Sequence, residues 1–203
     1  MPVLTRFGQS DVAYDLVTQT TLPSWGYMLK NGATTIWELW SNKVGMGMNS
    51  HNHPAFGSVG QWLYQALVGI NLEPDHPGYE RIRIQPQTVR DLEWVSGSMN
   101  TIRGLIASSW KRTSETLTLD VTIPVGSEAD IVIPKPARAV ASSSNEYLKG
   151  LPPEFTIREG DGLVWQNGFK PGRPGIRSAR DVGRAVEFVT GSGHYVFELQ
   201  QAQ

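Results

Sequence analysis

The stretch Leu117-Thr-Leu-Asp-Val-Thr-Ile123 alternates apolar and polar residues over seven positions. Successive side chains of a β-strand point to opposite faces of the sheet, so this pattern predicts a strand with one buried and one solvated face. Arg81-Ile-Arg-Ile84 repeats the pattern on a shorter scale. Further short strands are expected at residues 131–133, 162–166, 185–189 and 195–199. Many short strands separated by turns predict an antiparallel β-sandwich in this part of the chain.

The part of the chain that precedes these strands has a different sequence pattern, because its apolar residues are spaced as in a helix. They recur at i, i+3 and i+4 from Ser58 to Ile70, which predicts a helix over that range. Ser10 is expected to cap a helix that runs to about Thr20. Thr34 to Trp40 is a short helical candidate, and residues 42–52, which contain two glycines, are expected to form a loop.

Charge is unevenly distributed along the chain. Of the 18 Lys and Arg and the 19 Asp and Glu residues, six lie in residues 1–70 and the other 31 in residues 71–203. A free-standing domain of about 70 residues usually covers its large surface with charge. The first part is therefore expected to belong to a larger core. The boundary is expected between residues 71 and 80, where Pro74 and Pro77 break any helix, and residues 145–153 and 170–175 are expected to be surface loops.

Composition excludes several classes of protein. With 203 residues, 39% of them apolar, the chain can bury a sizeable core and is not intrinsically disordered. A net charge of −1 argues against nucleic-acid binding by bulk charge. No apolar run approaches the roughly 20 residues of a membrane helix, and residues 1–10 contain no signal-peptide core. Cysteine is absent, which excludes thiolate metal sites, and nothing in the composition assigns a compartment.

The segment from Pro23 to Trp40 gathers aromatic rings, hydroxyls and one carboxylate within 18 residues. Aromatic faces that stack on C–H groups, with a few polar groups that hold hydroxyls, suit a sugar site. Glu38 lies beside Trp37 and Trp40, where partial desolvation would make it a better proton acceptor for activating a water. The alternative reading is an exposed glutamate on a helix.

The histidine and remaining tryptophan residues allow weaker inferences. His51 and His53 would point to opposite sides of an extended segment, which is poor geometry for one metal ion, so no metal site is expected there. No cofactor is expected for the chain. One of the two could instead bond a substrate hydroxyl or fix the loop. Trp94, Trp110 and Trp165 are expected in the sandwich core, with sugar binding by one of them as the alternative.

Several motifs in the first part of the chain closely resemble the bacterial α-L-rhamnosidases of glycoside hydrolase family 78. The most specific is the run Asn31-Gly-Ala-Thr-Thr-Ile-Trp-Glu38, and later segments look like the strands that follow that family's barrel. The motifs that carry the resemblance are Gln9-Ser-Asp11, Thr18-Gln-Thr20, Pro23-Ser-Trp-Gly-Tyr27, Asn31 to Glu38, Asn52-His53, Phe56-Gly-Ser-Val59, Pro74 to Pro86, Asp91 to Trp94 and Leu117 to Pro124.

This resemblance implies an α + β, multi-domain fragment. Residues 1–72 would be the terminal helices of an (α/α)6 six-hairpin catalytic barrel, and residues 73–203 would be an antiparallel β-sandwich. The family hydrolyses terminal α-L-rhamnosides with inversion, which requires two carboxylates with room for a water between them. By resemblance Glu38 is the general base, His53 contacts the substrate, and Trp25 and Trp37 line the pocket.

The chain departs from the family pattern in one respect, because the acidic motif that carries the general acid has no counterpart in it. Asp11 and Asp15 do not match that motif, so the chain by itself is expected to be inactive. Its expected partners are an α-L-rhamnoside or L-rhamnose and the remainder of the barrel, with neither nucleic acid nor a membrane. Two alternatives stay open: a non-catalytic module that binds carbohydrate or a partner, and another six-hairpin inverting glycosidase that acts on a different sugar.

Overall fold

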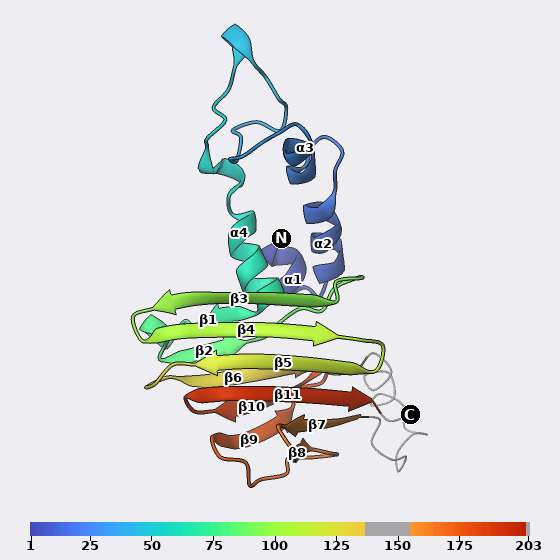
Figure 1. Cartoon of the computed structure of the whole chain (residues 1–203), viewed down its shortest axis with the longest axis vertical. Helices are drawn as coiled ribbons and strands as arrows, with labels where there is room; N and C mark the ends of the chain where they lie inside the picture. The colour runs from blue at the N-terminus through green and yellow to red at the C-terminus, as the bar shows by residue number, and fades with distance from the viewer. Residues whose placement is uncertain (137–154, 202–203) are drawn as a thin grey trace. The chain divides into compact units, whose positions relative to one another are not determined.

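The computed structural model describes residues 1–136 and 155–201 (Figure 1). The chain divides into two compact units. The helical unit comprises Met1–Ala66 and Val89–Asp91, and the sandwich unit comprises Leu67–Thr88 and Leu92–Gln203. The expected loop at residues 145–153 lies outside the described residues, whereas residues 170–175 are a loop between two strands.

The helical unit is built from short helices and irregular loops. Its helices are α1 (Pro2–Arg6), α2 (Ser10–Thr18), α3 (Trp25–Lys30) and α4 (Val59–Trp62), with 3₁₀ turns η1 (Gly45–Gly47) and η2 (Pro54–Phe56). Ala13, Met28, Trp37, Trp62, Ala66 and Val89 are the buried apolar residues among those described in this unit. The Trp62 indole N–H donates to the Thr5 hydroxyl over 2.8 Å, which ties the last helix to the first.

The helix expected over residues 58–70 is confirmed as far as Val68, but its second half is a π-helix, η3 (Leu63–Val68). Ile70 is wrongly placed in that prediction, because it begins a strand. Gly69 separates the two elements with φ +83°, and a Cβ there would lie 2.4 Å from the Pro86 nitrogen. Only glycine fits this combination of left-handed backbone and close approach.

Two other helix predictions need correction. Helix α2 begins at Ser10, with Gln9 at the N-cap position and no side-chain cap, so Ser10 is a buried first residue of the helix. Residues 34–40 form no helix. Their backbone instead bonds to a distant segment: the Ser50 carbonyl accepts from the Glu38 N–H, and the Ile36 carbonyl accepts from the His53 N–H. Residues 42–52 form a loop as expected, with η1 inside it.

The sandwich unit contains two β-sheets (Figure 1). Sheet A has the order β1-β2-β6-β10-β9, and sheet B has the order β3-β4-β5-β11-β7-β8. The strands of sheet A are β1 (Ile70–Leu72), β2 (Arg81–Ile84), β6 (Glu128–Pro134), β10 (Ala185–Thr190) and β9 (Ile176–Asp181). Those of sheet B are β3 (Trp94–Thr101), β4 (Gly104–Arg112), β5 (Thr116–Ile123), β11 (Gly193–Gln201), β7 (Phe155–Glu159) and β8 (Gly162–Trp165).

The predicted antiparallel sandwich is confirmed, with one parallel pair that was not expected. Strands β2 and β6 run parallel, while the other strand pairs are antiparallel. The chain leaves sheet A after β2, makes β3, β4 and β5 in sheet B, and returns to sheet A as β6. A crossover of this length permits a parallel pair, which a short hairpin does not.

The core is formed by strands of both sheets, along which buried and more exposed side chains alternate. In β5 the residues Leu117, Leu119, Val121 and Ile123 are buried, and the residues between them are half-exposed. Trp110 and Trp165 are buried as predicted. Trp94 was expected in the core as well, but this is wrong, because its side chain lies on the opposite face of β3 from Val95 and is 65% exposed.

An ion-pair network covers the face of sheet A that points away from the core. Glu187 on β10 is only 3% exposed and lies between two guanidinium groups: Arg83 on β2 is 3.1 Å from one carboxylate oxygen, and Arg180 on β9 is 2.5 Å from the other. Next to it, Asp130 on β6 accepts two hydrogen bonds, of 2.7 and 2.6 Å, from Arg81. The network bridges four neighbouring strands.

Glu187→Gln is expected to lower the free energy of unfolding by about 2 kcal/mol. A buried carboxylate with two cationic partners costs several kcal/mol to break, and the partial exposure of both arginines reduces that figure. Urea unfolding of the chain measures the change. Glu198→Gln, at an exposed position on β11, is the matched control and is expected to change stability by less than about 0.5 kcal/mol. Equal stability of the two variants would contradict a structural role for the network.

Candidate functional site

Two segments of the helical unit lie side by side and carry most of the predicted site residues. The Glu38 N–H donates to the Ser50 carbonyl over 2.9 Å, and the His53 N–H donates to the Ile36 carbonyl over 2.8 Å. The Thr35 hydroxyl donates to the His51 carbonyl between these two contacts. Residues 35–38 and 50–53 therefore form one local assembly, although the loop of residues 39–49 separates them in the sequence.

The carboxylate of Glu38 is fixed within this assembly. Its Oε2 accepts a hydrogen bond of 2.9 Å from the Ser50 N–H, and its own N–H is bonded to the same residue. The side chain is half-buried. Among the described residues, no group donates to Oε1. One oxygen thus orients the carboxylate, and the other is left for a water or a substrate group.

His53 is held in one tautomer by the start of η2. Its Nδ1 accepts a hydrogen bond of 3.1 Å from the Ala55 N–H, and this contact caps the 3₁₀ turn. A neutral imidazole that accepts at Nδ1 carries its proton at Nε2. The Nε2–H is therefore a donor with a defined direction, as a group that binds a sugar hydroxyl needs to be.

The neighbouring ring of Trp37 packs against His51. The two rings stack with centroids 5.0 Å apart and an interplanar angle of 26°, and Trp37 is 3% exposed. Trp37 therefore has almost no exposed surface in the described structure. His51 Nε2 and Asn49 Oδ1 are buried polar atoms that have no hydrogen-bond partner among the described residues. Both flank Ser50, the residue that holds Glu38.

Trp25 belongs to a second aromatic group in the same unit. Ser24 is buried and caps α3, where its Oγ accepts from the Tyr27 N–H over 2.9 Å. This cap places Trp25 at the first position of the helix. Its indole N–H donates to the Phe56 carbonyl over 3.1 Å, and its ring meets Trp40 edge-on at 5.0 Å. Trp40 in turn stacks on Phe56, with centroids 3.8 Å apart.

The helical unit therefore holds a carboxylate with one free oxygen, an oriented imidazole donor and a group of aromatic rings. Residues 1–67 match the family model for the bacterial alpha-L-rhamnosidase 6 hairpin glycosidase domain, and residues 69–148 match the model for the bacterial alpha-L-rhamnosidase C-terminal domain. The chain belongs to the bacterial α-L-rhamnosidase family. The two matches follow one another along the chain, and the second covers the first part of the sandwich unit.

Individual relatives agree with the rhamnosidase assignment. An alpha-L-rhamnosidase of Alteromonas sp. (strain LOR) is 37% identical over 155 residues, which are 72% of this chain and 17% of the relative. The structure of the alpha-L-rhamnosidase from Dictyoglumus thermophilum matches 98% of this chain with a TM-score of 0.81 and 34% identity. The Streptomyces avermitilis alpha-L-rhamnosidase, solved in complex with L-rhamnose, matches 97% with a TM-score of 0.72 and 30% identity. The chain spans about a fifth of either structure's length.

The other two acidic residues of the first 70 are engaged elsewhere in this chain. Asp15 accepts hydrogen bonds of 2.9 and 2.5 Å from the Arg90 guanidinium, and Asp11 accepts from the Arg90 backbone N–H over 2.9 Å. Hydrogen bonding from Arg90, assisted by its positive charge, holds the pKa of Asp15 below its ordinary value. A general acid must carry a proton at the working pH, so Asp15 is unsuited to that role.

Arg90→Ala is expected to raise the pKa of Asp15 toward the ordinary value. The pKa of Asp15 is lower in the folded chain than in the unfolded one. The Asp15–Arg90 contact therefore stabilises the fold at a pH above the ordinary pKa of Asp15, and this stabilisation is lost as the pH falls through the lowered pKa. An NMR titration of the Asp15 carboxyl carbon measures the shift. Arg90→Lys keeps the positive charge but loses the pair of guanidinium N–H donors, so it is expected to give an intermediate pKa for Asp15. Identical titration curves in all three proteins would contradict this assignment.

Sequence reasoning missed the groups that position the site residues. The donors to Glu38 and His53 are the backbone N–H groups of Ser50 and Ala55, which carry no side-chain signature. Arg90 lies 75 residues from Asp15 in the sequence. Among the described residues, no three His, Asp or Glu side chains gather as a metal site. Every described helix is also too short or too polar to span a bilayer.

Proposed function

We propose that this chain supplies the general base, Glu38, to an inverting α-L-rhamnosidase that hydrolyses terminal α-L-rhamnosides. The observation that carries the proposal is the fixed carboxylate. In a chain of the rhamnosidase family, Glu38 is held through Oε2 by the Ser50 N–H at 2.9 Å, while Oε1 has no donor among the described residues. The bound rhamnose of the Streptomyces avermitilis relative supports the choice of sugar.

In the proposed reaction, Glu38 takes a proton from a water as that water attacks the anomeric carbon of rhamnose. A protonated carboxyl on the opposite face of the sugar donates to the departing oxygen. His53 donates from Nε2 to a rhamnose hydroxyl, which orients the ring for attack. Trp25 lines the pocket with its ring face, and Trp37 contributes a ring edge while it keeps His51 in place.

The second carboxyl group is proposed to come from residues outside this chain. Asp11 and Asp15 are both bonded to Arg90, and Glu38 cannot serve as base and acid in one step. We propose that residues 1–72 complete a six-hairpin barrel and that residues 73–203 form its accompanying sandwich. Exposed apolar side chains of the helical unit are the surfaces that the rest of the barrel would cover; they include Leu29, Leu39, Val44, Met46 and Met48.

A chimera tests this function. The segment of the Dictyoglumus thermophilum α-L-rhamnosidase that superposes on this chain is replaced by residues 1–203. The chimera is expected to hydrolyse an aryl α-L-rhamnoside and to release the β-anomer of L-rhamnose first, as proton NMR of the early reaction would show. The 203-residue chain alone is expected to give no turnover, because it holds the base without the acid.

Three results would overturn the proposal. Release of the α-anomer first would exclude inversion, and with it the role of Glu38 as a base. Turnover by the isolated chain would show that the second carboxyl group lies within it. A folded chimera that cleaves another sugar and leaves rhamnosides intact would favour a different six-hairpin glycosidase.

A further inference from the structure

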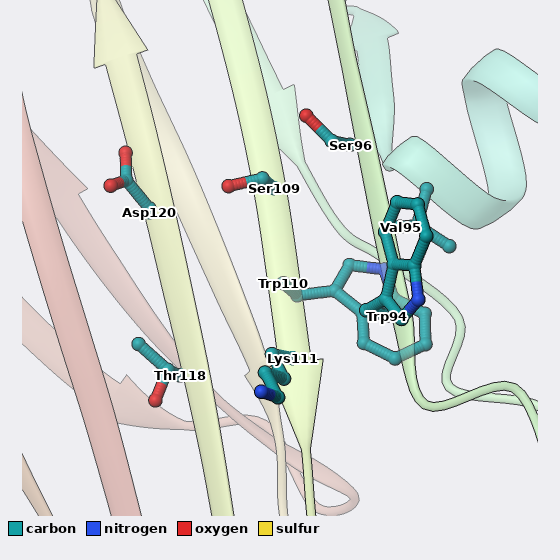
Figure 2. A pocket seen from close by; sticks show the side chains of 8 residues that line it. All are labelled: Trp94, Val95, Ser96, Ser109, Trp110, Lys111, Thr118 and Asp120. Carbon is teal, nitrogen blue, oxygen red and sulfur yellow. The ribbon is translucent and has the colours of Figure 1, made fainter.

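A second candidate site lies in the sandwich unit, on the outer face of sheet B near its edge strand β3. A pocket of about 540 Å³ opens there, within the range typical of small-ligand sites. Figure 2 shows its wall on three adjacent strands, β3, β4 and β5. The residues that line it are Trp94, Val95, Ser96, Ser109, Trp110, Lys111, Thr118 and Asp120.

The register of the sheet arranges the outward-facing side chains in two rows across the strands. Trp94 pairs with Lys111, which pairs with Thr118, and this makes the first row. The second row is Ser96, Ser109 and Asp120, paired in the same way (Figure 2). Neighbouring strands lie about 4.8 Å apart, so each row presents polar groups at that interval. The exposed indole of Trp94 stands at one end of the rows.

The polar groups of the pocket are available to a ligand. In the part of the chain that the structure describes, the side chains of Ser96, Ser109, Lys111 and Thr118 have no hydrogen-bond partner. Asp120 contacts His194 Nε2 through Oδ1 at 2.8 Å, and Oδ2 takes no part in this contact. One ammonium and one carboxylate give the lining no net charge. This balance favours a neutral ligand with many hydroxyls over a phosphate or a nucleic acid.

Strand β4, which lies beneath the pocket, is fixed by hydrogen bonds from its inner face. Trp110 points to the inner face of β4, where its indole N–H donates to the Leu67 carbonyl over 2.7 Å. On the same face, the Ser108 hydroxyl donates to the Val68 carbonyl over 2.8 Å. Both residues are buried. The strand that carries Ser109 and Lys111 is therefore anchored, and the two rows keep their spacing without a ligand.

We propose that this pocket is a carbohydrate-binding subsite for a neutral pyranose, separate from the Glu38 site. The Trp94 ring stacks on the C–H face of the sugar, while Ser96, Ser109 and Asp120 bond its hydroxyls. An apolar peptide is a poorer fit, because the outward rows hold one large apolar ring among five polar side chains. The subsite would keep the chain on a glycan whether or not the catalytic site is complete.

Titration of the ¹⁵N-labelled chain with methyl α-L-rhamnopyranoside tests this subsite. The Trp94 indole N–H and the amides of Ser96, Ser109 and Asp120 are expected to shift together, with a Kd of about 1 mM, as few atoms are buried. Trp94→Ala is expected to weaken binding by about tenfold or more, and Trp94→Phe by less. Because Trp94 is exposed, neither change threatens the fold.

Two further variants separate this site from its alternatives. Ile102→Ala removes another exposed apolar side chain, in the β3–β4 turn, and is expected to leave the Kd unchanged. Glu38→Gln is expected to leave the shifts in the sandwich unit unchanged, so failure of the catalytic proposal would not be mistaken for failure of this one. The absence of shifts on β3, β4 and β5, or equal shifts in Trp94→Ala, would overturn the proposal.

Discussion

In the chimera, Glu38→Gln is expected to lower kcat for an aryl α-L-rhamnoside by about 10²–10⁴-fold, with little change in KM. Glutamine keeps the size of the side chain, and its amide oxygen can still accept from the Ser50 N–H, so the two segments stay together. It cannot take a proton from water. The loss therefore falls on the chemical step and leaves the sugar-binding groups intact.

Asp11→Asn is the matched control for this substitution. It makes the same change of a carboxylate to an amide in the same unit, and asparagine can still accept from the Arg90 N–H. The rate of this variant is expected to stay close to that of the parent chimera. Equal losses in the two variants would indicate that both act through the fold, and would contradict a specific role for Glu38.

Trp110→Ala is expected to lower the free energy of unfolding of the sandwich unit by about 3–5 kcal/mol. The side chain is 2% exposed, and its removal leaves a large cavity between β4 and the end of η3. It also leaves the Leu67 carbonyl without its hydrogen-bond donor, and this loss is part of the expected decrease in the free energy of unfolding. Urea unfolding, followed by the amide signals of β4 and β5, measures the change.

Two related variants divide this effect into its parts. Trp110→Phe keeps most of the ring volume and loses the indole N–H, so a loss of about 1–3 kcal/mol is expected. Trp94→Ala removes the same kind of side chain from the exposed face of the neighbouring strand and is expected to cost less than about 0.5 kcal/mol. If Trp94→Ala and Trp110→Ala destabilised the unit equally, the assignment of inner and outer faces would be wrong.

Local periodicity predicted the elements whose burial alternates cleanly. Residues 117–123 and 81–84 read as strands because every second side chain enters the core. Strands β3 and β4 were not predicted, because serine and glycine occupy inward-facing positions where apolar residues would have shown the alternation. Ser108 is buried in the core, where its hydroxyl bonds to the Val68 carbonyl, a contact across 40 residues of sequence.

Contacts between distant residues explain where the helix predictions failed. Ile36, Trp37 and Trp40 have helical spacing, yet the backbone of this segment bonds to residues 50–53 instead. The helix that begins at Val59 ends where Gly69 approaches Pro86, and that proximity exists only once the sandwich has formed. Helix propensity and the spacing of apolar residues depend only on residues that are close in sequence. Neither could show that residues 34–40 form no helix or that the later helix ends before Ile70.

The side chains of the candidate site were proposed from the sequence, whereas the groups that hold them in place were not. Local composition and family resemblance both pointed to Glu38, because a lone carboxylate among tryptophans is unusual. The Ser50 and Ala55 N–H groups that orient Glu38 and His53 are backbone atoms, which every non-proline residue possesses. For Trp94, residue type alone suggested the core, whereas its register opposite Lys111 places it on the solvated face.

Azide rescue of the Glu38→Ala chimera tests the role of Glu38 most directly. Azide is a nucleophile that needs no deprotonation, and it fits the space left by the carboxylate. Added azide is expected to restore cleavage of an aryl α-L-rhamnoside and to yield the β-configured rhamnosyl azide, identified by proton NMR. Failure of azide to restore cleavage in a folded variant, or an α-configured azide, would contradict the assignment of Glu38 as the base that activates water.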